Sequence, residues 1–201
     1  MLIETIIVGP LQVNCYILAC PQTGRAVVID PGADPEKITR RIKKKNFKVE
    51  YIINTHGHID HIGANAVLGV PVYIHRLDAD FLLKPELNLS GMLGAPLNFP
   101  AASLLLEDKQ KLRLGNIELE VIHTPGHTPG GICLKTSGIC FTGDTLFAQS
   151  IGRTDLPYAS YETILNSIRG RLMSLDDNVV IYPGHGSSST IGEERENNPF
   201  I

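Results

Sequence analysis

The chain has 201 residues, a hydrophobic fraction of 43% and a formal net charge of −3. This length suits one compact domain, residues 1–201, with a sizeable core, and the small charge argues against a nucleic-acid-binding or membrane-surface protein. No apolar run is long enough to span a bilayer and the N-terminus lacks a basic leader, so we expect a cytoplasmic protein with no nucleic acid and no membrane as partner. The four cysteines match no zinc or redox spacing, as expected of small buried residues in a reducing compartment.

Three closely spaced strands open the chain. Apolar and β-branched residues predict them over Leu2–Val8, Asn14–Ala19 and Arg25–Ile29. The short turns between these strands indicate antiparallel pairing. A helix is expected next, with Asp34 as its N-cap, Pro35 at its first position and its end near Asn46.

A dense group of possible metal ligands follows the next predicted strand, Val49–Asn54. The segment His56–His61 holds three histidines and one aspartate, and imidazole and carboxylate groups bind zinc, manganese and iron well. A single loop histidine is more often an ordinary polar residue, but four such side chains this close together indicate a metal site. No cysteine pair accompanies them, which excludes a zinc finger. We expect the group on a loop at the C-terminal end of a strand, before a short helix over Ile62–Leu68 that stops at Gly69.

The middle of the chain contains a long segment without a regular pattern. It follows a predicted strand, Val70–Ile74, and a predicted helix, Arg76–Leu83, and it spans residues 84–102. Turn residues alternate there with apolar ones, which are Leu87, Leu89, Met92, Leu93, Leu97 and Phe99. Such a loop is either the lid or wall of a substrate pocket or ordinary packing, and both interpretations are kept.

Two hairpins, a strand and two helices are predicted for the second half. In chain order they are a hairpin over Leu112–Val121 that turns at Gly115-Asn116, a hairpin from Ile132–Leu134 to Ile139–Thr142, a helix capped by Ser160, a strand over Asn178–Tyr182, and a short helix that starts at Thr190.

Four of the predicted strands end in candidate ligands. The first leads into the His56–His61 segment, and the later ones end just before His127, Asp144 and His185. A glycine directly precedes each of these three residues and allows a sharp turn out of the strand. Each residue alone would be an ordinary loop residue, but together they predict one metal site with seven ligands: His56, His58, Asp60, His61, His127, Asp144 and His185.

This ligand set resembles that of the metallo-β-lactamase superfamily, in which His-x-His-x-Asp-His is followed by His, Asp and His at later strand ends. The resemblance covers essentially the whole chain. It implies an α+β fold, a four-layer αββα sandwich with the metal site at one edge of the two sheets. It also implies two divalent metal ions per chain, zinc first, with iron or manganese as alternatives. By position, the first ion would be held by His56, His58 and His127, the second by Asp60, His61 and His185, and Asp144 would bridge them.

Longer motifs around the ligands resemble the glyoxalase II (hydroxyacylglutathione hydrolase) branch. They are Gly126-His127-Thr128-Pro129-Gly130-Gly131, residues 141–147, residues 152–157 and Tyr182-Pro183-Gly184-His185-Gly186. The sequence stops at Ile201 and shows no counterpart of the C-terminal glutathione-binding helical domain of that enzyme, so it is similar to the short, single-domain glyoxalase II-like proteins. The resemblance implies hydrolysis of a small acyl thioester of the S-lactoylglutathione type, with the thiol part left open.

The chemistry of such a site gives each residue an expected role. Two divalent ions can share a bridging water and lower its pKa, so that the hydroxide attacks the thioester carbonyl. Asp60 is the expected catalytic residue, because it can both bind metal and orient that hydroxide. Arg153 could bind a substrate carboxylate or simply pair with Asp155, and Tyr158 is a weaker candidate for substrate binding. Three threonines could orient ligands and two histidines fall outside the motif; these are Thr55, Thr142 and Thr145, and His75 and His123.

Other functions on the same fold remain open. The segment Gly152–Asp155 is also similar to one in the iron-dependent persulfide dioxygenases, which use a single iron held by two histidines and one aspartate. The Pro-Gly-His-Gly motif around His185 favours two metals instead. Hydrolases of lactones, β-lactams or phosphodiesters are further alternatives. A non-enzymatic binding module would be expected to lack ligands, and none is missing here.

Overall fold

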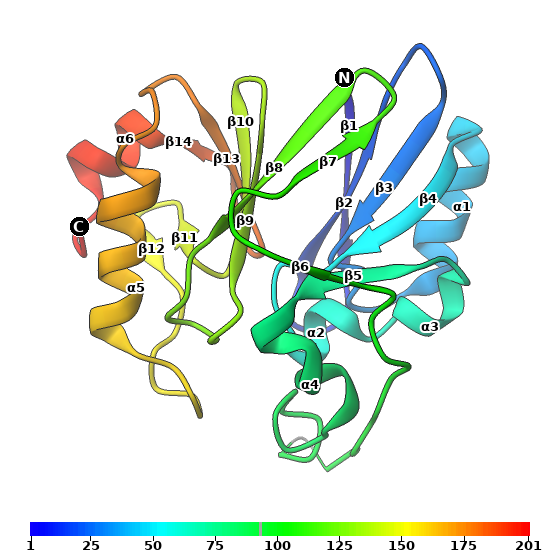
Figure 1. Cartoon of the computed structure of the whole chain (residues 1–201), viewed down its shortest axis with the longest axis horizontal. Helices are drawn as coiled ribbons and strands as arrows, with labels where there is room; N and C mark the ends of the chain where they lie inside the picture. Colours follow the sequence, from blue (N-terminus) through cyan, green and yellow to red (C-terminus); the bar gives the residue numbers. More distant parts are fainter. Residues whose placement is uncertain (93) are drawn as a thin grey trace.

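Two six-stranded sheets form the centre of the computed structural model, which describes residues 1–92 and 94–201 (Figure 1). The first sheet has the order β1-β2-β3-β4-β5-β6. Its strands are β1 (Leu2–Val8), β2 (Val13–Ala19), β3 (Arg25–Ile29), β4 (Lys48–Ile53), β5 (Val72–His75) and β6 (Leu104–Leu106). The first three strands pair antiparallel, as predicted, and β3 to β6 pair parallel.

The second sheet has the order β14-β13-β10-β9-β8-β7. Its strands are β7 (Lys111–Leu114), β8 (Ile117–His123), β9 (Ile132–Thr136), β10 (Ile139–Gly143), β13 (Val180–Pro183) and β14 (Ser189–Thr190). Only β10 and β13 run parallel in it; the remaining described pairs are antiparallel. A small separate hairpin joins β11 (Leu146–Phe147) to β12 (Ser150–Ile151).

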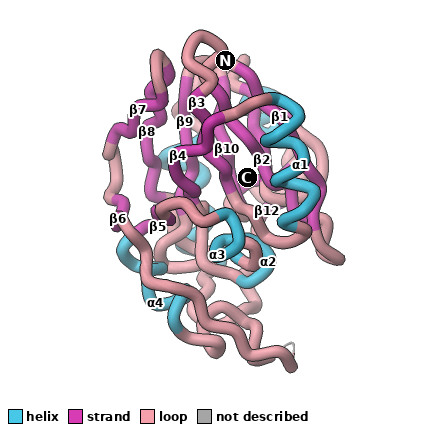
Figure 2. The backbone as a smooth tube through the Cα atoms, turned by 90° about the vertical axis from the view of Figure 1, so that its right-hand side faces the viewer, coloured by secondary structure: helices cyan, strands magenta, loops and turns pink. Residues whose placement is uncertain are grey.

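Helices cover the outer face of each sheet, so the fold has four layers (Figures 1 and 2). The helical elements are α1 (Pro35–Lys45), α2 (Ile59–Ile62), α3 (Asn65–Leu68), the 3₁₀ turn η1 (Arg76–Asp78), α4 (Ala79–Leu83), α5 (Tyr161–Ser167), the π-turn η2 (Ile168–Leu172) and α6 (Ile191–Asn197). Apolar residues of α1 and α3 pack on the first sheet, and those of α5, η2 and α6 pack on the second. The predicted α+β, αββα sandwich is confirmed.

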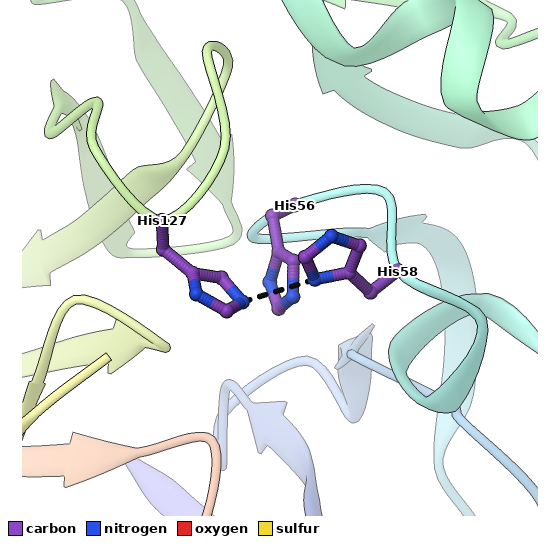
Figure 3. A group of neighbouring side chains, drawn as sticks. All are labelled: His56, His58 and His127. Carbon is purple, nitrogen blue, oxygen red and sulfur yellow. Dashed lines mark hydrogen bonds between the residues drawn. The ribbon is translucent and has the colours of Figure 1, made fainter. Parts of the chain in front are cut away.

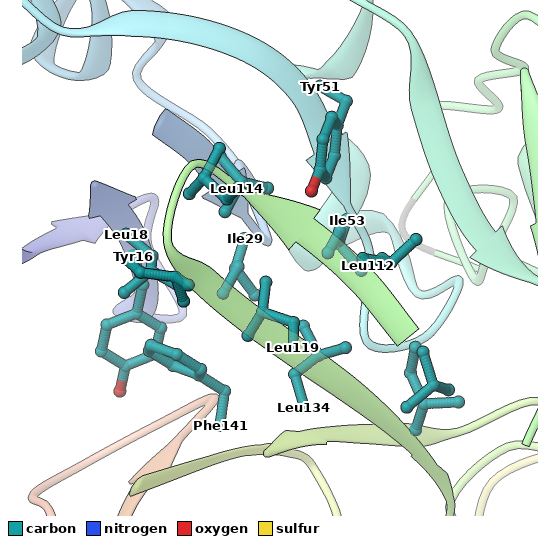
Figure 4. Packing of buried hydrophobic residues seen from close by; sticks show 14 of the residues in the cluster. Tyr16, Leu18, Ile29, Tyr51, Ile53, Leu112, Leu114, Leu119, Leu134 and Phe141 are labelled. Atoms are coloured by element: carbon teal, nitrogen blue, oxygen red, sulfur yellow. The ribbon is translucent and has the colours of Figure 1, made fainter. Parts of the chain in front are cut away.

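The central strands are buried on both faces, which explains their nearly continuous apolar sequences. In β2, Tyr16 and Leu18 point into the core between the sheets, whereas Cys15 and Ile17 point toward the outer helices. Figure 4 shows the first of these cores, where Phe141 of the second sheet meets Tyr16 with ring centroids 5.0 Å apart. This interdigitated core fixes the two sheets relative to each other.

Several predicted boundaries need correction. The helix expected over Ile62–Leu68 is two short helices, α2 and α3, and α2 begins early enough to include Asp60 and His61. The ligand segment is therefore half loop and half helix, not a loop throughout. Asp34 does precede α1, but its side chain does not cap the helix; it accepts a hydrogen bond from the Gly9 amide and pairs with Lys37. Among the described residues, no helix is both long and apolar enough to cross a membrane.

Candidate metal centre

The ends of four strands bring the seven predicted ligands to one edge of the two sheets. His56 and His58 follow β4, and Asp60 and His61 lie in α2 directly after them. His127 follows β8 on the other sheet. The last two ligands, Asp144 and His185, follow the parallel neighbours β10 and β13, so their side chains emerge side by side.

His56, His58 and His127 form a first triad, whose ligand atoms all lie within 4.8 Å of one another. Their rings meet edge to face, and His58 Nδ1 lies 3.0 Å from His127 Nε2 (Figure 3). All three side chains are buried. The triad joins both halves of the fold, because its first two members come from the first sheet and His127 comes from the second.

Asp60, His61 and His185 form a second triad within the same 4.8 Å limit. His61 Nε2 and His185 Nε2 lie 3.4 Å apart, and His185 Nε2 is 3.4 Å from the Asp60 carboxylate. Asp144 lies between the triads: its carboxylate is 3.4 Å from His61 Nε2, 3.5 Å from His185 Nε2 and 3.6 Å from His127 Nε2. These two triads have the membership that the resemblance implies for two ligand sets, and a third close group, His56, His61 and Asp144, links them.

Hydrogen bonds aim one ring nitrogen of most of these histidines into the cluster. The Nδ1 of His61 donates to Asp30, that of His127 to the Arg153 carbonyl, and that of His185 to the Leu11 carbonyl, over 2.8–3.0 Å. The Nδ1 of His56 lies 3.2 Å from the Thr55 hydroxyl. Each of these rings therefore turns its Nε2 toward the cluster, as metal-binding histidines do.

Two histidines of the first triad, His56 and His58, are held in their neutral form. Burial keeps the pKa of His56 well below its ordinary value, and burial together with the neighbouring His127 lowers the pKa of His58 to about 3. Neutral imidazole is the form that binds metal. The first triad is thus ready to bind a cation without losing a proton from His56 or His58.

The second triad is charged in the metal-free protein. Burial would lower the pKa of both histidines, but the carboxylates of Asp144 and Asp60 outweigh it. The pKa of His61 rises to about 9, with a contribution from Asp30, and that of His185 rises to about 10. The same ion pairs hold the pKa of Asp144 below its usual range despite its burial. The carboxylates around the second triad therefore favour positive charge there.

The donor set fits two divalent ions. His56 Nε2 and Asp144 Oδ1 are buried and have no hydrogen-bond partner among the described residues. His58 instead turns its Nδ1 toward His127 Nε2 in the triad. Buried polar atoms are normally paired, and coordination to a cation is one way to satisfy such atoms. Five imidazoles and two carboxylates match zinc, iron or manganese rather than calcium or magnesium, which favour oxygen ligands alone.

Two glycines are needed at the site for different reasons. Gly143 precedes Asp144 with φ +48°, a conformation that favours glycine, as the sequence predicted. Gly184 precedes His185 without a positive φ, so the predicted reason is wrong there. Instead, a Cβ at Gly184 would overlap the Asp144 carboxylate and lie 2.8 Å from the His61 ring. The absence of a side chain at Gly184 therefore allows the backbone after β13 to lie close to Asp144 and His61.

The loop that carries His185 is tied to β2. Asn14 donates from its side chain to the carbonyls of Pro183 and Gly186, at 3.1 and 2.8 Å. The Tyr16 hydroxyl donates to the same Pro183 carbonyl at 2.6 Å. The site therefore has structural support from the neighbouring sheet at its second triad.

A pocket of about 530 Å³ lies over the cluster. Its described lining, apart from five cluster residues, is Leu11, Ile59, Leu89, Met92, Phe147, Arg153 and Leu156. Leu89 and Met92 come from the 84–102 loop, so this loop forms a wall of the pocket, while Phe99 packs against the core. Leu93, which belongs to the same predicted apolar set, lies outside the described residues.

Of the two predicted substrate-binding residues, Arg153 lines the pocket and Tyr158 does not. The side chain of Arg153 is two-thirds exposed, however, and its guanidinium pairs with Asp155 at 2.9–3.0 Å. Tyr158 is absent from the described lining; it is 64% exposed and its ring meets Phe81 edge-on. The backbone of Arg153 has the firmer role, because its carbonyl orients His127.

The model of the metallo-beta-lactamase superfamily matches residues 8–185 of the sequence. The chain belongs to this superfamily. It is 37% identical to hydroxyacylglutathione hydrolase GloC of Haemophilus influenzae over 213 residues, which cover 100% of this chain and 98% of that protein. The superfamily membership predicted from the ligand pattern is confirmed.

Solved structures of the superfamily resemble the whole chain. The B3 metallo-β-lactamase BLEG-1 superposes with a TM-score of 0.94 at 37% identity and covers 99% of both chains. TTHA1623, solved in a di-iron-bound form, superposes with a TM-score of 0.87 at 34% identity and covers 98% of this chain and 100% of that one. The chain is thus a protein of the metallo-β-lactamase superfamily with a His/Asp cluster suited to metal binding. GloC and BLEG-1 are equally similar to it in sequence, at 37% identity each.

Two buried carboxylates support this superfamily site but were not predicted. Asp30 accepts hydrogen bonds from the Thr55 amide and hydroxyl at 2.7 and 2.6 Å as well as from His61. Asp78 accepts from the amides of Gly57 and Gly130, at 3.0 and 2.6 Å. In the sequence, Asp30 precedes a Pro-Gly turn and Asp78 lies within the predicted helix Arg76–Leu83. Only their tertiary partners distinguish them from surface residues.

Proposed function

We propose that this chain is a dinuclear metal-dependent hydrolase of small acyl thioesters. The observation that carries the proposal is the character of the pocket outside the cluster. Its described lining there is apolar except for Arg153, which is already paired with Asp155. No side chain in that lining is placed to protonate a leaving group. A thiolate needs no such proton, because its thiol has a pKa of about 8.5, whereas an amine or alkoxide leaving group does.

The cluster residues have distinct roles in this proposal. His56, His58 and His127 would hold one divalent ion, Asp60, His61 and His185 the other, and Asp144 would contact both. When bound, the two ions would supply Lewis-acid stabilisation of the carbonyl oxygen and lower the pKa of the attacking water. The metal is zinc, iron or manganese, and the substrate is a small molecule rather than a macromolecule.

Asp60 is the residue that would act on the attacking water. It lines the pocket, with its side chain about one-fifth exposed. Burial would raise its pKa, but His61 and His185 outweigh this effect and hold the pKa below its usual value. The carboxylate is therefore ionised at neutral pH and can accept a hydrogen bond from the water, which directs the water toward the carbonyl carbon. No serine or cysteine nucleophile is required.

The test is hydrolysis of S-D-lactoylglutathione and of S-acetyl-N-acetylcysteamine, with metal content measured on the same sample. We expect turnover from protein that holds about two ions per chain, and a loss of roughly 10²–10⁴-fold in kcat for Asp60→Asn. Asp176→Ala is the control, because Asp176 is exposed and lies away from the cluster. Fully metallated protein that cleaves neither thioester would overturn the proposal.

The resemblance to BLEG-1 makes β-lactam hydrolysis a second candidate. A chromogenic cephalosporin assayed on the same sample separates it from thioester hydrolysis. Oxygen uptake with glutathione persulfide, together with a single bound iron per chain, would instead identify the dioxygenase alternative. All of these assays use one protein preparation. A lack of activity toward one substrate can therefore be compared directly with activity toward the others.

A further inference from the structure

A second cavity, of about 390 Å³, lies beside the pocket over the metal cluster. It is bounded by the β1–β2 turn, by the loop after β3, by α2 and by Leu97 of the 84–102 loop. Leu11, Ile59 and Asp60 line both cavities. The second cavity therefore adjoins the candidate active site at these shared residues. Its volume falls in the range of small-ligand sites, roughly 300–1,000 Å³.

Its walls are apolar. Apart from Asp60, the described lining consists of glycines and apolar side chains, among them Val8, Pro10 and Ala33. The floor is closely packed backbone: a Cβ at Gly32 would overlap the Asp60 carbonyl, and one at Gly63 would overlap the Gly32 carbonyl. The cavity thus presents no cation among its described residues to bind a carboxylate.

The mouth of the cavity exposes apolar side chains to solvent. Leu11 is 56% exposed and Leu97 is 47% exposed, and Met92 at the edge of the neighbouring pocket is 69% exposed. Contiguous exposed apolar residues around a cleft are typical of a binding site, because a bound apolar group removes them from water. A long substrate held at the cluster would reach these exposed apolar side chains by extending past Asp60, which lines both cavities.

We propose that this cavity, defined by Val8, Pro10, Leu11, Ala33 and Leu97, binds an apolar arm of the substrate. This inference rests on the proposed thioester hydrolysis and specifies its substrate class: thioesters with an aliphatic or aromatic group larger than lactoyl. The arm belongs either to the acyl part or to the thiol part. The charged glutathione tripeptide does not match this lining, whereas a neutral chain does.

The experiment compares two substrate series on metal-loaded protein. One series varies the acyl group of N-acetylcysteamine thioesters from acetyl to octanoyl; the other varies the thiol of acetyl thioesters from N-acetylcysteamine to octanethiol. We expect kcat/KM to rise at least tenfold with chain length in one series, and that series identifies the arm. A flat dependence in both series would overturn the subsite while leaving thioester hydrolysis intact.

Three variants test whether this cavity causes the dependence of kcat/KM on chain length. Ala33→Leu fills the cavity and Leu97→Glu places a charge at its mouth, so each should reduce the long-chain to short-chain ratio of kcat/KM at least tenfold. Leu97 is partly exposed, so its variant keeps the test valid if Ala33→Leu does not fold. Val67→Ala, at an exposed residue of α3 outside both cavities, should leave the ratio unchanged. An equal ratio in all these variants would overturn the proposal.

Binding of octanamide to the metal-free protein, measured by isothermal titration calorimetry, tests the cavity without catalysis. We expect binding that weakens at least fivefold in Ala33→Leu or Leu97→Glu and not in Val67→Ala. If metallated protein cleaves no thioester, the proposed function fails, and this measurement alone decides the subsite. The proposed apolar subsite would be overturned if octanamide did not bind, or if neither Ala33→Leu nor Leu97→Glu weakened its binding.

Discussion

The Thr128 hydroxyl donates a hydrogen bond of 2.7 Å to the Asp78 carboxylate, and this contact joins the two halves of the first triad. Asp78 comes from the first half of the chain, and it also accepts from the amide of Gly57, between His56 and His58. Thr128 follows His127 in the loop between β8 and β9 of the second sheet. A single buried carboxylate therefore holds together the strand-end loops that must stay in register for the three histidines to share one ion.

Asp78→Ala should weaken metal binding at the first triad without touching a ligand. Loss of the carboxylate leaves the Gly57 and Gly130 amides and the Thr128 hydroxyl without their acceptor, which should cost about 2–4 kcal/mol of unfolding free energy. Metal affinity should fall roughly 10–100-fold, as for other groups that orient ligands. Chemical denaturation and titration against a competing chelator measure the two effects.

The matched control for that substitution is Asp80→Ala. Asp80 is two residues away and forms an exposed ion pair with Lys84, so its loss should change stability by less than about 0.5 kcal/mol. If Asp78→Ala and Asp80→Ala bind metal equally well, Asp78 has no positioning role.

Asp78 should also give the metal-free protein a distinctive pH dependence. Burial raises the pKa of its carboxyl to about 6, although its hydrogen bonds oppose this. Between about pH 4 and pH 6 the folded state thus binds more protons at this residue than the unfolded state, so its contribution to stability falls as the pH rises. Asp78→Asn removes this contribution. The unfolding free energy of the wild type relative to Asp78→Asn should fall by up to about 3 kcal/mol across that range.

Measuring the difference between the two proteins cancels the titration of the other groups. Urea denaturation in the presence of a chelator, at intervals from pH 4 to pH 6.5, gives the two curves. Parallel curves would show that Asp78 does not titrate in this range.

The sequence predicted those features that a local pattern encodes. The strands Leu2–Val8 and Arg25–Ile29 and the turn at Gly115-Asn116 lie where alternation and turn residues placed them. The seven candidate ligands could be singled out because they lie in segments that follow strands, and strand ends meet at a sheet edge. The superfamily resemblance then gave the layer order, which local patterns do not contain.

The missed elements depend on neighbours that are distant in the sequence. β6 and β14 are strands of three and two residues, and each forms only because β5 or β13 offers it an edge. Asp30 and Asp78 were missed for the same reason, since their hydrogen-bond partners lie 21 to 52 residues away. No spacing rule links an isolated aspartate to such partners before the fold is known.

The two ions should differ in how their binding depends on pH. His61 and His185 have pKa values raised to about 9 and about 10, so both carry a proton at pH 7 that a metal ion must displace. His56 and His58 are already neutral there. The affinity of the second triad should therefore rise by about two logarithmic units per pH unit between pH 7 and pH 8.5, since two protons are released.

The affinity of the first triad should be much less dependent on pH over the same range. Competition titrations with a chelator at fixed pH values resolve the two ions. Equal slopes for both would contradict the prediction that metal binding displaces protons from His61 and His185 but not from His56 and His58.

Gly184→Ala should disable the site while sparing the fold. The added Cβ would overlap the Asp144 carboxylate, which lies between the triads, so this carboxylate must move away from its position. We expect metal content to fall below two ions per chain and activity to fall at least about 100-fold, because a displacement of about 1 Å at a reacting centre has that effect. Gly170→Ala is the control: a Cβ there meets nothing within 4 Å, and it should leave metal content unchanged. Circular dichroism verifies folding. A Gly184→Ala protein with two ions and full activity would show that the cluster tolerates movement of Asp144.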